Sequence, residues 1–546
     1  MATLEKRTSE GYDDEVDKAP VVAAYSLDER RMAALAEVDN AKFSRFHFKI
    51  CMVAGVGFFT DSYDIFAINI ASIMLGYVYA GSAGLSASQD LGVKVATPVG
   101  TLVGQVLFGW LADRVGRKRM YGFELTIMIV ATFAQALSGN ADAVNIIGAL
   151  VVWRFIMGVG VGGDYPLSAV ISSEFSSTHI RGRLITAVFA FQGWGNFSAA
   201  LVSLILVTAY KSQLLSETTA NPIAIDYMWR LLIGLGCVPA VVALYFRLTI
   251  PETPRFTMDI ERNLEQATAD IIGALRHQDV HYDPDNIRRV AAPKASWSDF
   301  SRHFGKWENF KLLFGAAYSW FALDISYFGL GLNSAIILSA VGFGSPDPKV
   351  TGTLKYYQNL YNVSVGNLIL SVAGLIPGYW ASFLVIDSWG RRPIQLMGFS
   401  ILTVIFTVMG FGYNAMIATA AGTKVFIFLY CLANFFQNFG PNVTTFVIPG
   451  EAFPTRYRST GHGICAASGK VGAIVIQVVF AKLKNIGGTN AFLPHILEIF
   501  AFFMITGVCS TLLLPETKSK SLEELSNENQ DGFVQGYARN STNQRA

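Results

Sequence analysis

Charged side chains are scarce in this sequence. Asp, Glu, Lys and Arg make up only 15% of the 546 residues, whereas hydrophobic residues make up 52% and the mean hydropathy is +0.39. Soluble globular proteins do not usually have this balance. The net charge of +2 comes without a basic domain, which argues against a nucleic-acid partner. The composition therefore predicts a polytopic membrane protein that resides in the lipid bilayer.

Several other classes of protein are excluded because the sequence lacks their characteristic motifs. The five cysteines all lie in apolar segments, so neither a disulfide framework nor a metal site is expected. The glycine-rich stretch "GVGVGGD" lacks the Lys-Ser/Thr pair of a nucleotide-binding loop, so the sequence predicts no ATPase and no cofactor. Residues 1–46 lack the apolar core and cleavage site of a signal peptide, and we expect them to form a soluble tail.

Apolar stretches long enough to cross a membrane recur along the chain. A helix of about 20 residues spans the ~30 Å hydrocarbon core of a bilayer. Twelve such stretches are found, at 48–75, 92–112, 121–138, 145–166, 186–210, 229–249, 311–341, 364–386, 395–413, 424–449, 462–482 and 493–514. The sequence therefore predicts an all-α membrane protein with twelve transmembrane helices.

Arginine clusters predict the orientation of these helices. The connections after helices two, four, eight and ten are rich in arginine, whereas the intervening loops carry isolated lysines. Lys and Arg accumulate in cytoplasmic loops. We therefore expect both termini in the cytoplasm, and we expect the protein to lie in the plasma membrane.

The two halves of the sequence repeat. The stretch "GWLADRVGRK" recurs as "LVIDSWGRRP", "SEFSSTHIRGR" as "GEAFPTRYRST", and "PETPR" as "PETKS", in the same order. This repeat predicts two pseudo-symmetric six-helix bundles, which in secondary transporters hold the substrate between them near the membrane midplane. The expected segments are a tail at 1–46, a bundle at 47–250, a cytosolic linker at 251–308, a bundle at 309–514 and a tail at 515–546.

Charged residues at the cytosolic helix ends are expected to form gates. Gly116 and Gly390 permit tight turns, where the preceding Asp113 and Asp387 can bond to arginine or cap the next helix. Two further pairs, Glu174 with Arg181 and Glu451 with Arg456, suit an interlocking network. The residues assigned to gating are Asp113, Arg117, Glu174, Arg181, Asp387, Arg391, Glu451 and Arg456.

Four aspartates lie inside the apolar stretches: Asp61, Asp64, Asp164 and Asp324. A charged carboxylate in a bilayer costs several kcal/mol or more, so such residues are functional by default. Asp61 and Asp64 share one helix face, where their mutual repulsion favours a shared proton. The alternative is that Asp64 pairs with a neighbour such as Tyr63 or Arg154.

Several motifs resemble known families. The paired "DRVGRK" and "DSWGRRP" turns are similar to the signature of the major facilitator superfamily, and the likeness covers nearly the whole chain. The stretch "GGDYPLSAVISSE" resembles the signature of fungal and plant proton-coupled phosphate symporters. So do "GFFTDSYDIF", "WFALDI" and the stretch 438–473. The resemblance implies a transporter, not an enzyme, that imports inorganic phosphate with protons by alternating access.

The resemblance also implies site residues. Those expected to bind phosphate are Tyr165, Gln192, Trp320, Asp324, Asn442 and Lys470, and those expected to handle protons are Asp61, Asp64 and Asp164. Dihydrogen phosphate has donors and acceptors, so a pocket with one carboxylate, several neutral donors and one cation suits it. Lys470 could instead pair permanently with Asp324. Both are possible if the pair closes when the site is empty and opens for substrate.

The sequence departs from the family pattern once. The family usually places a tyrosine eight residues after the tryptophan of "WFALDI", but this chain has Phe328 there and Tyr327 one position earlier. One helical step rotates a side chain by about 100°. We therefore expect Phe328 to face the pocket and Tyr327 to face a neighbouring helix or lipid.

Two other functions are compatible with the sequence. One is proton-coupled symport of a sugar or an organic ion, and the other is a phosphate receptor with little flux. Lys470 in a membrane helix favours an anion over a sugar, and residues 515–546 contain no recognisable signalling domain. Arsenate, which matches phosphate in shape and charge, is a further candidate substrate. No feature of the sequence indicates an oligomeric state.

Overall fold

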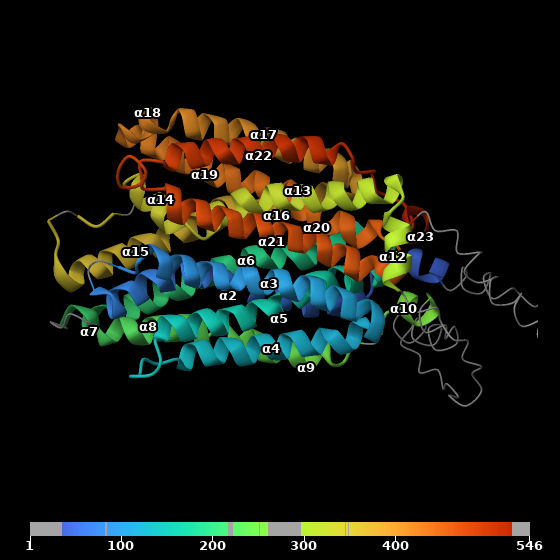
Figure 1. Ribbon diagram of the computed structural model, residues 1–546, viewed down its shortest axis with the longest axis horizontal. Helices are drawn as coiled ribbons and strands as arrows, with labels where there is room; N and C mark the ends of the chain where they lie inside the picture. The colour runs from blue at the N-terminus through green and yellow to red at the C-terminus, as the bar shows by residue number, and fades with distance from the viewer. Residues whose placement is uncertain are drawn as a thin grey trace, which may run out of the picture. The chain divides into compact units, whose positions relative to one another are not determined.

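A computed structural model describes residues 35–81, 84–216, 222–250, 252–259, 296–343, 345–347 and 349–526. Residues 37–528 belong to one compact unit, and the account below concerns the described residues of that unit. They form helices joined by turns, and the one β-type contact among them is an isolated bridge between Ala141 and Val144 (Figure 1).

The first half of the chain supplies six helical spans. They are α2 (Arg45–Tyr79), α3 (Ala87–Val115), α4 (Arg117–Leu137), α5 (Ile146–Phe175), α6 (Arg181–Ala209) and a span composed of α8 (Ile223–Gly234) and α9 (Cys237–Arg247). The short helices α7 (Lys211–Ser216) and α10 (Pro254–Asp259) precede and follow the sixth span.

The second half begins with α12 (Trp297–Phe304) and supplies six further spans. They are α13 (Trp307–Gly331) with the bent α14 (Ser334–Ala340), α15 (Gly352–Leu370) with α16 (Ile376–Trp389), α17 (Arg391–Phe411), α19 (Ala420–Asn438) with α20 (Pro441–Ala452), α21 (Arg458–Leu483) and α22 (Leu493–Thr511). A wider π-type turn, η3 (Ser371–Leu375), joins α15 to α16. Short segments at the ends are α18 (Tyr413–Ile417), the 3-10 turn η4 (Thr455–Tyr457) and α23 (Leu522–Leu525).

The described helices confirm the predicted all-α membrane fold. Eleven of them are long and apolar enough to cross a membrane, and the α13–α14 pair, bent by 59°, makes twelve. The eighth span begins at Gly352 instead of the predicted 364. Its first turns, "GTLKYYQNLYNV", are polar and aromatic, so a hydropathy pattern misses them although they continue the helix.

Two of the spans are each divided into two helices by a short break. Phe439 and Gly440 separate α19 from α20, because Pro441 lacks a backbone N–H and starts a new helix at its first position. The sixth span is interrupted at Leu235–Gly236, between α8 and α9.

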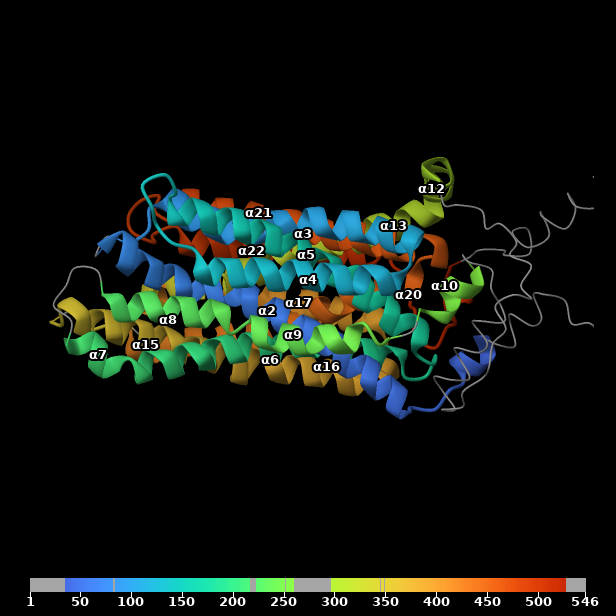
Figure 2. The ribbon, with the colours of Figure 1, turned by 90° about the horizontal axis from the view of Figure 1, so that it is seen from below.

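The two halves meet along two seams. In the first half α2 packs on α6, and α3 and α4 pack on α5; in the second half α13 packs on α21 and α22, and α17 packs on α22. Between the halves, α3 packs on α21, and α6 packs on α15 and α16 (Figures 1 and 2). We call these contacts the α3–α21 seam and the α6–α16 seam.

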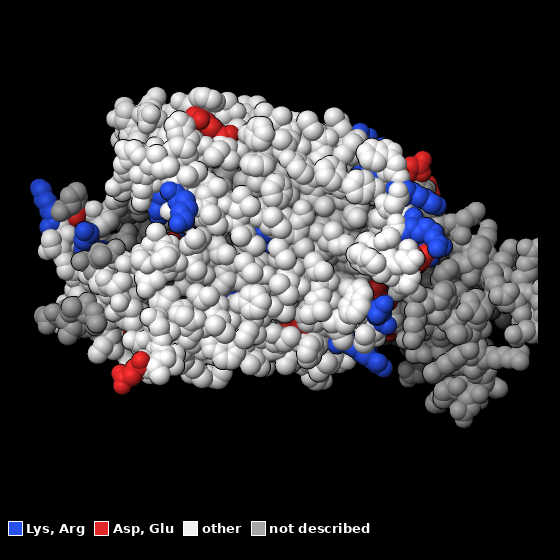
Figure 3. Space-filling view, viewed as in Figure 1, with Lys and Arg blue, Asp and Glu red and all other residues white. Residues whose placement is uncertain are grey.

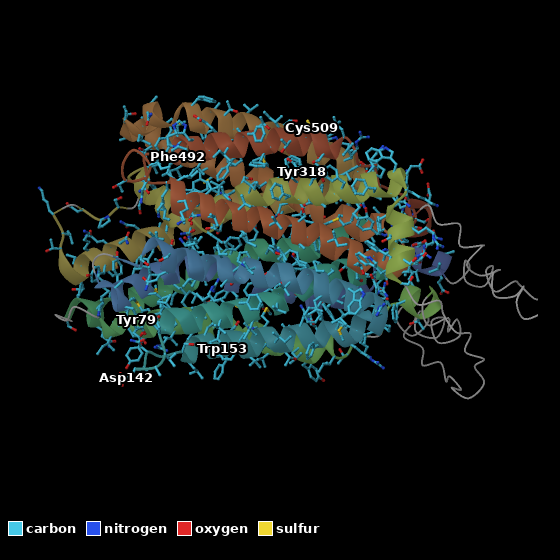
Figure 4. The ribbon with its side chains drawn as sticks, viewed as in Figure 1. Tyr79, Asp142, Trp153, Tyr318, Phe492 and Cys509 are labelled. Atoms are coloured by element: carbon cyan, nitrogen blue, oxygen red, sulfur yellow. The ribbon has the colours of Figure 1, made fainter. Side chains whose placement is uncertain are left out.

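The ends of the helices differ in character. The turns after α3, α5, α16 and α20, together with α10, α12 and α23, lie at one end, which we call the arginine-rich end (Figure 1). In Figure 3 the middle of the visible face is almost entirely free of charged side chains, and most of them gather near the two ends. At the opposite end Tyr79, labelled in Figure 4, donates a hydrogen bond of 2.7 Å to Asp226. An apolar belt between charged ends suits a bilayer.

Candidate functional site

A buried ion pair lies at the core of the site. Lys470 Nζ, from α21, is 2.8 Å from Asp324 Oδ2, from α13, and both side chains are 2% exposed. Gly469 allows this approach, because a Cβ there would be 2.5 Å from Trp320 Cδ1 and 2.8 Å from Asp324 Oδ2. The pairing alternative considered for Lys470 is therefore the arrangement seen in this structure.

Lys470 also connects the two halves. Its Nζ lies 5.1 Å from the centre of the Tyr165 ring, on α5, and 4.3 Å from that of the Phe328 ring, on α13. The Trp320 ring packs 6.2 Å from the Tyr165 ring. A cation over aromatic faces is held without a second negative charge. The ammonium group can therefore exchange Asp324 for an anion while staying close to the same rings.

Neutral hydrogen-bonding groups surround this pair. The Tyr165 hydroxyl accepts from Gln192 Nε2 (2.9 Å), Tyr379 donates to Gln192 Oε1 (3.2 Å), and Asn442 Nδ2 donates to the Tyr379 hydroxyl (2.8 Å). These groups come from α5, α6, α16 and α20. The structure thus brings all six residues expected to bind phosphate into one buried cluster between the halves.

Tyr379 was not predicted. It is 1% exposed and joins Gln192 of the first half to Asn442 of the second. The only signal for it in the sequence is a hydroxyl-bearing side chain within the apolar run "GLIPGYWASF". Tyrosine in such a run is common at membrane interfaces, so the sequence alone gave no reason to single it out.

The expectation that Tyr327 points away from the site is wrong. Helix α13 is regular through Gly331, and Tyr327 and Phe328 are both buried. The Tyr327 side chain interacts with those of Tyr379 and Asn442, while the Phe328 ring lies next to Lys470. At this depth helices of both halves flank α13, so two adjacent positions can contact the same site.

Asp164 belongs to an ion network within the first half. It accepts from Arg247 Nη2 (2.6 Å) and from Ser168 Oγ (2.5 Å), and Arg247 also pairs with Glu124. Arg247 reaches Asp164 past α2 because residue 57 is glycine, where a Cβ would be 1.7 Å from Arg247 Nη2. The network contains one arginine and two carboxyl groups.

Arg247 and Glu124 were not predicted as functional residues, although each is a charged residue within an apolar stretch of the sequence. They lie in the apolar runs "ALYFRLTI" and "MYGFELTI", and they deserve the same functional reading as the four aspartates. Both are almost fully buried, with side-chain exposures of 0% and 1%. Their pairing could not be predicted, because 123 residues separate them in the chain.

Asp61 and Asp64 do not have equivalent surroundings. Asp61 is 0% exposed, and neither of its carboxyl oxygens has a hydrogen-bond partner among the described residues. Asp64 accepts from Thr132 Oγ1 (2.9 Å). Of the two suggested partners of Asp64, Tyr63 donates to the Leu232 carbonyl (2.6 Å) and Arg154 Nε donates to the Val93 carbonyl (2.8 Å), and the charge of Arg154 acts on Asp64 without a hydrogen bond between them. Neither aspartate thus has a counter-charge in contact, and of the two Asp61 also lacks any hydrogen-bond partner in the described part of the chain.

Asp113 and Asp387 each bridge the halves at the arginine-rich end. Asp113 accepts from the backbone N–H groups of Ser459 (3.2 Å) and Thr460 (2.7 Å), which begin α21. Asp387 accepts from the backbone N–H groups of residues 182 (3.1 Å) and 183 (2.9 Å), which begin α6. Each aspartate also pairs with the arginine four residues later, at 3.2 and 3.0 Å. Both therefore cap a helix of the other half and not the next helix in the chain.

The salt-bridge network at this end is present, but its partners differ from those expected. Glu174 pairs with Arg458 (2.8 Å) across the halves, and not with Arg181. Glu451 pairs with Arg391 (2.8 Å), and not with Arg456. The two remaining arginines pair with other acids: Arg181 lies 3.4 Å from Asp39, and Arg456 lies 3.3 Å from Asp299. At a helix end, side chains of residues that are close in sequence point to different sides. Proximity in the chain therefore predicted the wrong salt-bridge partners.

The repeated "PET" segments complete the turns. Glu252 accepts from the backbone N–H groups of residues 117 and 118, and Glu516 from those of residues 391 and 392, at 3.0–3.3 Å. Gly116 and Gly390 have φ of 110° and 107°, and a Cβ there would be 2.6 and 2.7 Å from these carboxylates. Each carboxylate thus caps the helix that follows a left-handed glycine.

Contacts between the halves also close the opposite end. Asn69 Nδ2 donates to Ser334 Oγ (2.5 Å), and Asn359 Nδ2 donates to the Tyr77 hydroxyl (2.7 Å). The Tyr77 ring stacks on that of Tyr356 at 4.1 Å. Because contacts join the halves at both ends and the site residues are buried between them, the structure represents an occluded arrangement.

Comparison with known proteins yields a coherent set of relatives. The sugar (and other) transporter family matches residues 50–528. A repressible high-affinity phosphate permease of Neurospora crassa is 49% identical over 92% of this chain and 90% of its own length. The inorganic phosphate transporter PHO84 of Saccharomyces cerevisiae is 48% identical over 91% of this chain and 87% of its own. The proton:xylose symporter XylE, of the major facilitator superfamily, shares the fold with a TM-score of 0.65 at 19% identity, over 88% of this chain and 98% of its own.

Proposed function

This chain belongs to the sugar (and other) transporter family of the major facilitator superfamily, and we propose that it imports inorganic phosphate together with protons by alternating access. We place it in the plasma membrane with the arginine-rich end facing the cytoplasm, because Lys and Arg accumulate on that side. Arsenate should be a competing substrate, since it matches phosphate in shape and charge. The protein acts as a carrier and not as an enzyme.

The observation that supports phosphate is the buried Lys470–Asp324 pair beside a ring of neutral donors. Dihydrogen phosphate brings two hydroxyl donors and a negative charge. Asp324 accepts one substrate hydroxyl, and Lys470 moves from Asp324 to a phosphate oxygen. Tyr165, Gln192 and Asn442 then donate to the remaining oxygens. A neutral sugar has no negative charge with which to replace Asp324 as the partner of Lys470.

Proton coupling is assigned to the acids of the first half. Asp61 is buried with no hydrogen-bond partner among the described residues, and a carboxyl group in that position is much less costly as the neutral acid. Asp164 is instead held by Arg247, whose second partner is Glu124. We assign the carried proton to Asp61 and the control of its release to the Asp164–Arg247–Glu124 network.

Alternating access would use the two sets of contacts between the halves. At the arginine-rich end Asp113 and Asp387 release the starts of α21 and α6, while the contacts of Asn69 and Tyr77 remain. The reverse set opens the opposite end. The occluded arrangement lies between these states, with the substrate residues shielded from both sides.

Uptake of labelled phosphate into proteoliposomes tests the proposal. We expect accumulation that depends on an inward proton gradient, that is inhibited by excess arsenate, and that sugars and organic anions leave unchanged. Uptake of a sugar in place of phosphate would identify a different symporter. Phosphate binding without flux, in vesicles whose incorporation is verified, would identify a receptor and overturn the transport proposal.

A further inference from the structure

An apolar groove lies on the outer surface along the α6–α16 seam. It has a volume of about 620 Å³, and its walls come from the start of α2, from α6 and from α16. Aromatic side chains dominate the walls: Phe43, Phe48, Phe191, Trp194, Trp380 and Phe383. Several remain open to the surroundings, for example Phe48 at 57% and Trp380 at 43% exposed. Helices of both halves therefore share one apolar groove at their junction.

The dimensions of the groove match one leaflet of a bilayer. Along α6 it extends from Arg183, at the arginine-rich end, to Trp194. Eleven helical residues rise about 16 Å, which is close to half of the ~30 Å hydrocarbon thickness. One lipid acyl chain of that leaflet would fill it with its headgroup level with Arg183.

The charge at the mouth of the groove selects the headgroup. Arg183 is exposed, its Nη2 donates to the Leu384 carbonyl at 3.4 Å, and its charge also acts on the nearby Asp387 carboxylate. A guanidinium group binds phosphate oxygens well, and the cytoplasmic leaflet is the one that carries anionic lipids. We propose that this groove binds one acidic phospholipid of the leaflet at the arginine-rich end, with an acyl chain against the aromatic walls and its phosphate on Arg183.

The position of the groove gives the lipid a role in gating. The backbone N–H of Arg183 donates to Asp387 (2.9 Å), one of the contacts that closes this end. A lipid that touches α2, α6 and α16 together, and that orders the Arg183 side chain, stabilises these helices in the closed arrangement. When the halves separate at this end, α6 moves away from α16 and the groove loses one wall. The bound lipid therefore favours the state closed at the arginine-rich end.

Lipid binding to the purified protein tests the proposal, independently of phosphate transport. Native mass spectrometry with added phosphatidylglycerol or phosphatidylcholine should detect one tightly held phosphatidylglycerol. Arg183→Gln should remove the preference for phosphatidylglycerol, and Ala187→Phe, which places a ring in the groove, should weaken binding of both lipids severalfold. Matched controls are Arg119→Gln, an exposed arginine at the same end, and Val130→Phe, on the outer face of α4; both should bind as the wild type does.

Hydrogen exchange supplies the second measurement. In phosphatidylglycerol vesicles the first turn of α6 should exchange more slowly than in phosphatidylcholine, and Arg183→Gln should abolish the difference. Unchanged lipid binding in both groove variants would overturn the proposal, as would equal losses in the two controls. Displacement of the phospholipid by a sterol would also overturn it, because the headgroup would then not be the ligand of Arg183.

Discussion

At the scale of single residues, Asp324 is distinguished by its partner. Lys470 holds it directly, and both are buried between the halves. Asp324→Asn keeps the volume but replaces an acceptor by an amide that can present a donor to a phosphate hydroxyl, leaving a buried mismatch of about 1–3 kcal/mol. We expect phosphate affinity to fall by about tenfold or more and uptake to be lost, with normal insertion in the membrane. Wild-type uptake by a well-expressed variant would remove Asp324 from the site.

The hydroxyl of Tyr327 leads to a second prediction. Because Tyr327 interacts with Tyr379 and Asn442, it occupies the side of the site where the neutral donors lie. Tyr327→Phe should weaken phosphate binding by about two- to tenfold, the effect of one neutral hydrogen bond of about 0.5–1.5 kcal/mol. Phe328→Tyr should change affinity little, since its ring is already packed beside Lys470. A phosphate titration of both variants checks this, and the opposite ranking would contradict it.

Asp61 and Asp164 should respond differently to neutral replacement. Asp61→Asn removes a group that has no hydrogen-bond partner in the described ranges, so the protein should remain stable and exchange phosphate while losing accumulation driven by a proton gradient. Asp164→Asn leaves Arg247 with Glu124 as its one remaining acid in the network, so this variant should be less stable than Asp61→Asn. Thermal unfolding should therefore separate the two variants. Proton-driven accumulation by Asp61→Asn, measured with ionophore controls, would place the proton elsewhere.

At the scale of helices, α23 is held in place by one strong ion pair. Glu523 accepts from Arg255 Nε at 2.8 Å. Burial alone would raise the pKa of Glu523, but the charges of Arg255 and Arg458 outweigh it and lower the pKa from 4.5 to about 2. That difference corresponds to about 3 kcal/mol for docking α23. Because the folded pKa is lowered, this contribution is complete above pH 4.5 and disappears as the pH falls toward 2.

Neutralising this carboxylate should therefore reproduce the effect of acid at ordinary pH. We expect Glu523→Gln to make the segment that contains α23 more sensitive to limited proteolysis at pH 7, and to remove the acid-dependent increase in cleavage below pH 4.5. The exposed Glu524 beside it is a matched control, and Glu524→Gln should behave as the wild type does. Equal sensitivity of all three proteins would show that the ion pair does not hold α23.

How well a structural feature could be predicted depended on how far apart in the sequence its interacting residues lie. The spans were predictable because an apolar helix is recognised from its own residues, as α17 and α22 illustrate. Intramembrane charges such as Asp164 were recognisable for the same reason, by their cost in lipid. The partners of these charged residues could not be predicted. The contacts of Glu174 with Arg458 and of Asp387 with the start of α6 join residues that are far apart in the chain. Nothing in the local sequence specifies such partners.

At the scale of the whole molecule, two equivalent latches close the arginine-rich end. Asp113 holds α21 and Asp387 holds α6, each through backbone N–H groups. Hydrogen bonds to a charged group contribute about 1.5–3 kcal/mol. Asp387→Asn or Asp113→Asn should therefore shift the molecule toward opening at this end, and the double variant should shift it further.

A buried reporter can measure this opening. Ala169 is 0% exposed and faces Gly450 of the other half, 3.6 Å from the position of a Cβ there. We expect Ala169→Cys to react faster with a membrane-impermeant thiol reagent when either latch is neutralised. Asp142→Asn, at the opposite end in Figure 4, should leave the reaction rate unchanged. An unchanged rate in the latch variants would mean that other contacts keep the end closed.

The π-type turn η3 has a consequence for helical register. It lies between the part of the eighth span that contacts α6 through Ser364 and Ser203 (2.8 Å) and the part that carries Tyr379. A π-type turn accommodates one extra residue, and each residue turns a helix by about 100°. If Ser371–Leu375 were wound as a regular α-helix with no residue deleted, Ser364 would stay in place but α16 would turn by about 100°. Tyr379 would then face away from Gln192 and Asn442, so a five-residue irregularity determines which face of α16 meets the buried cluster between the halves.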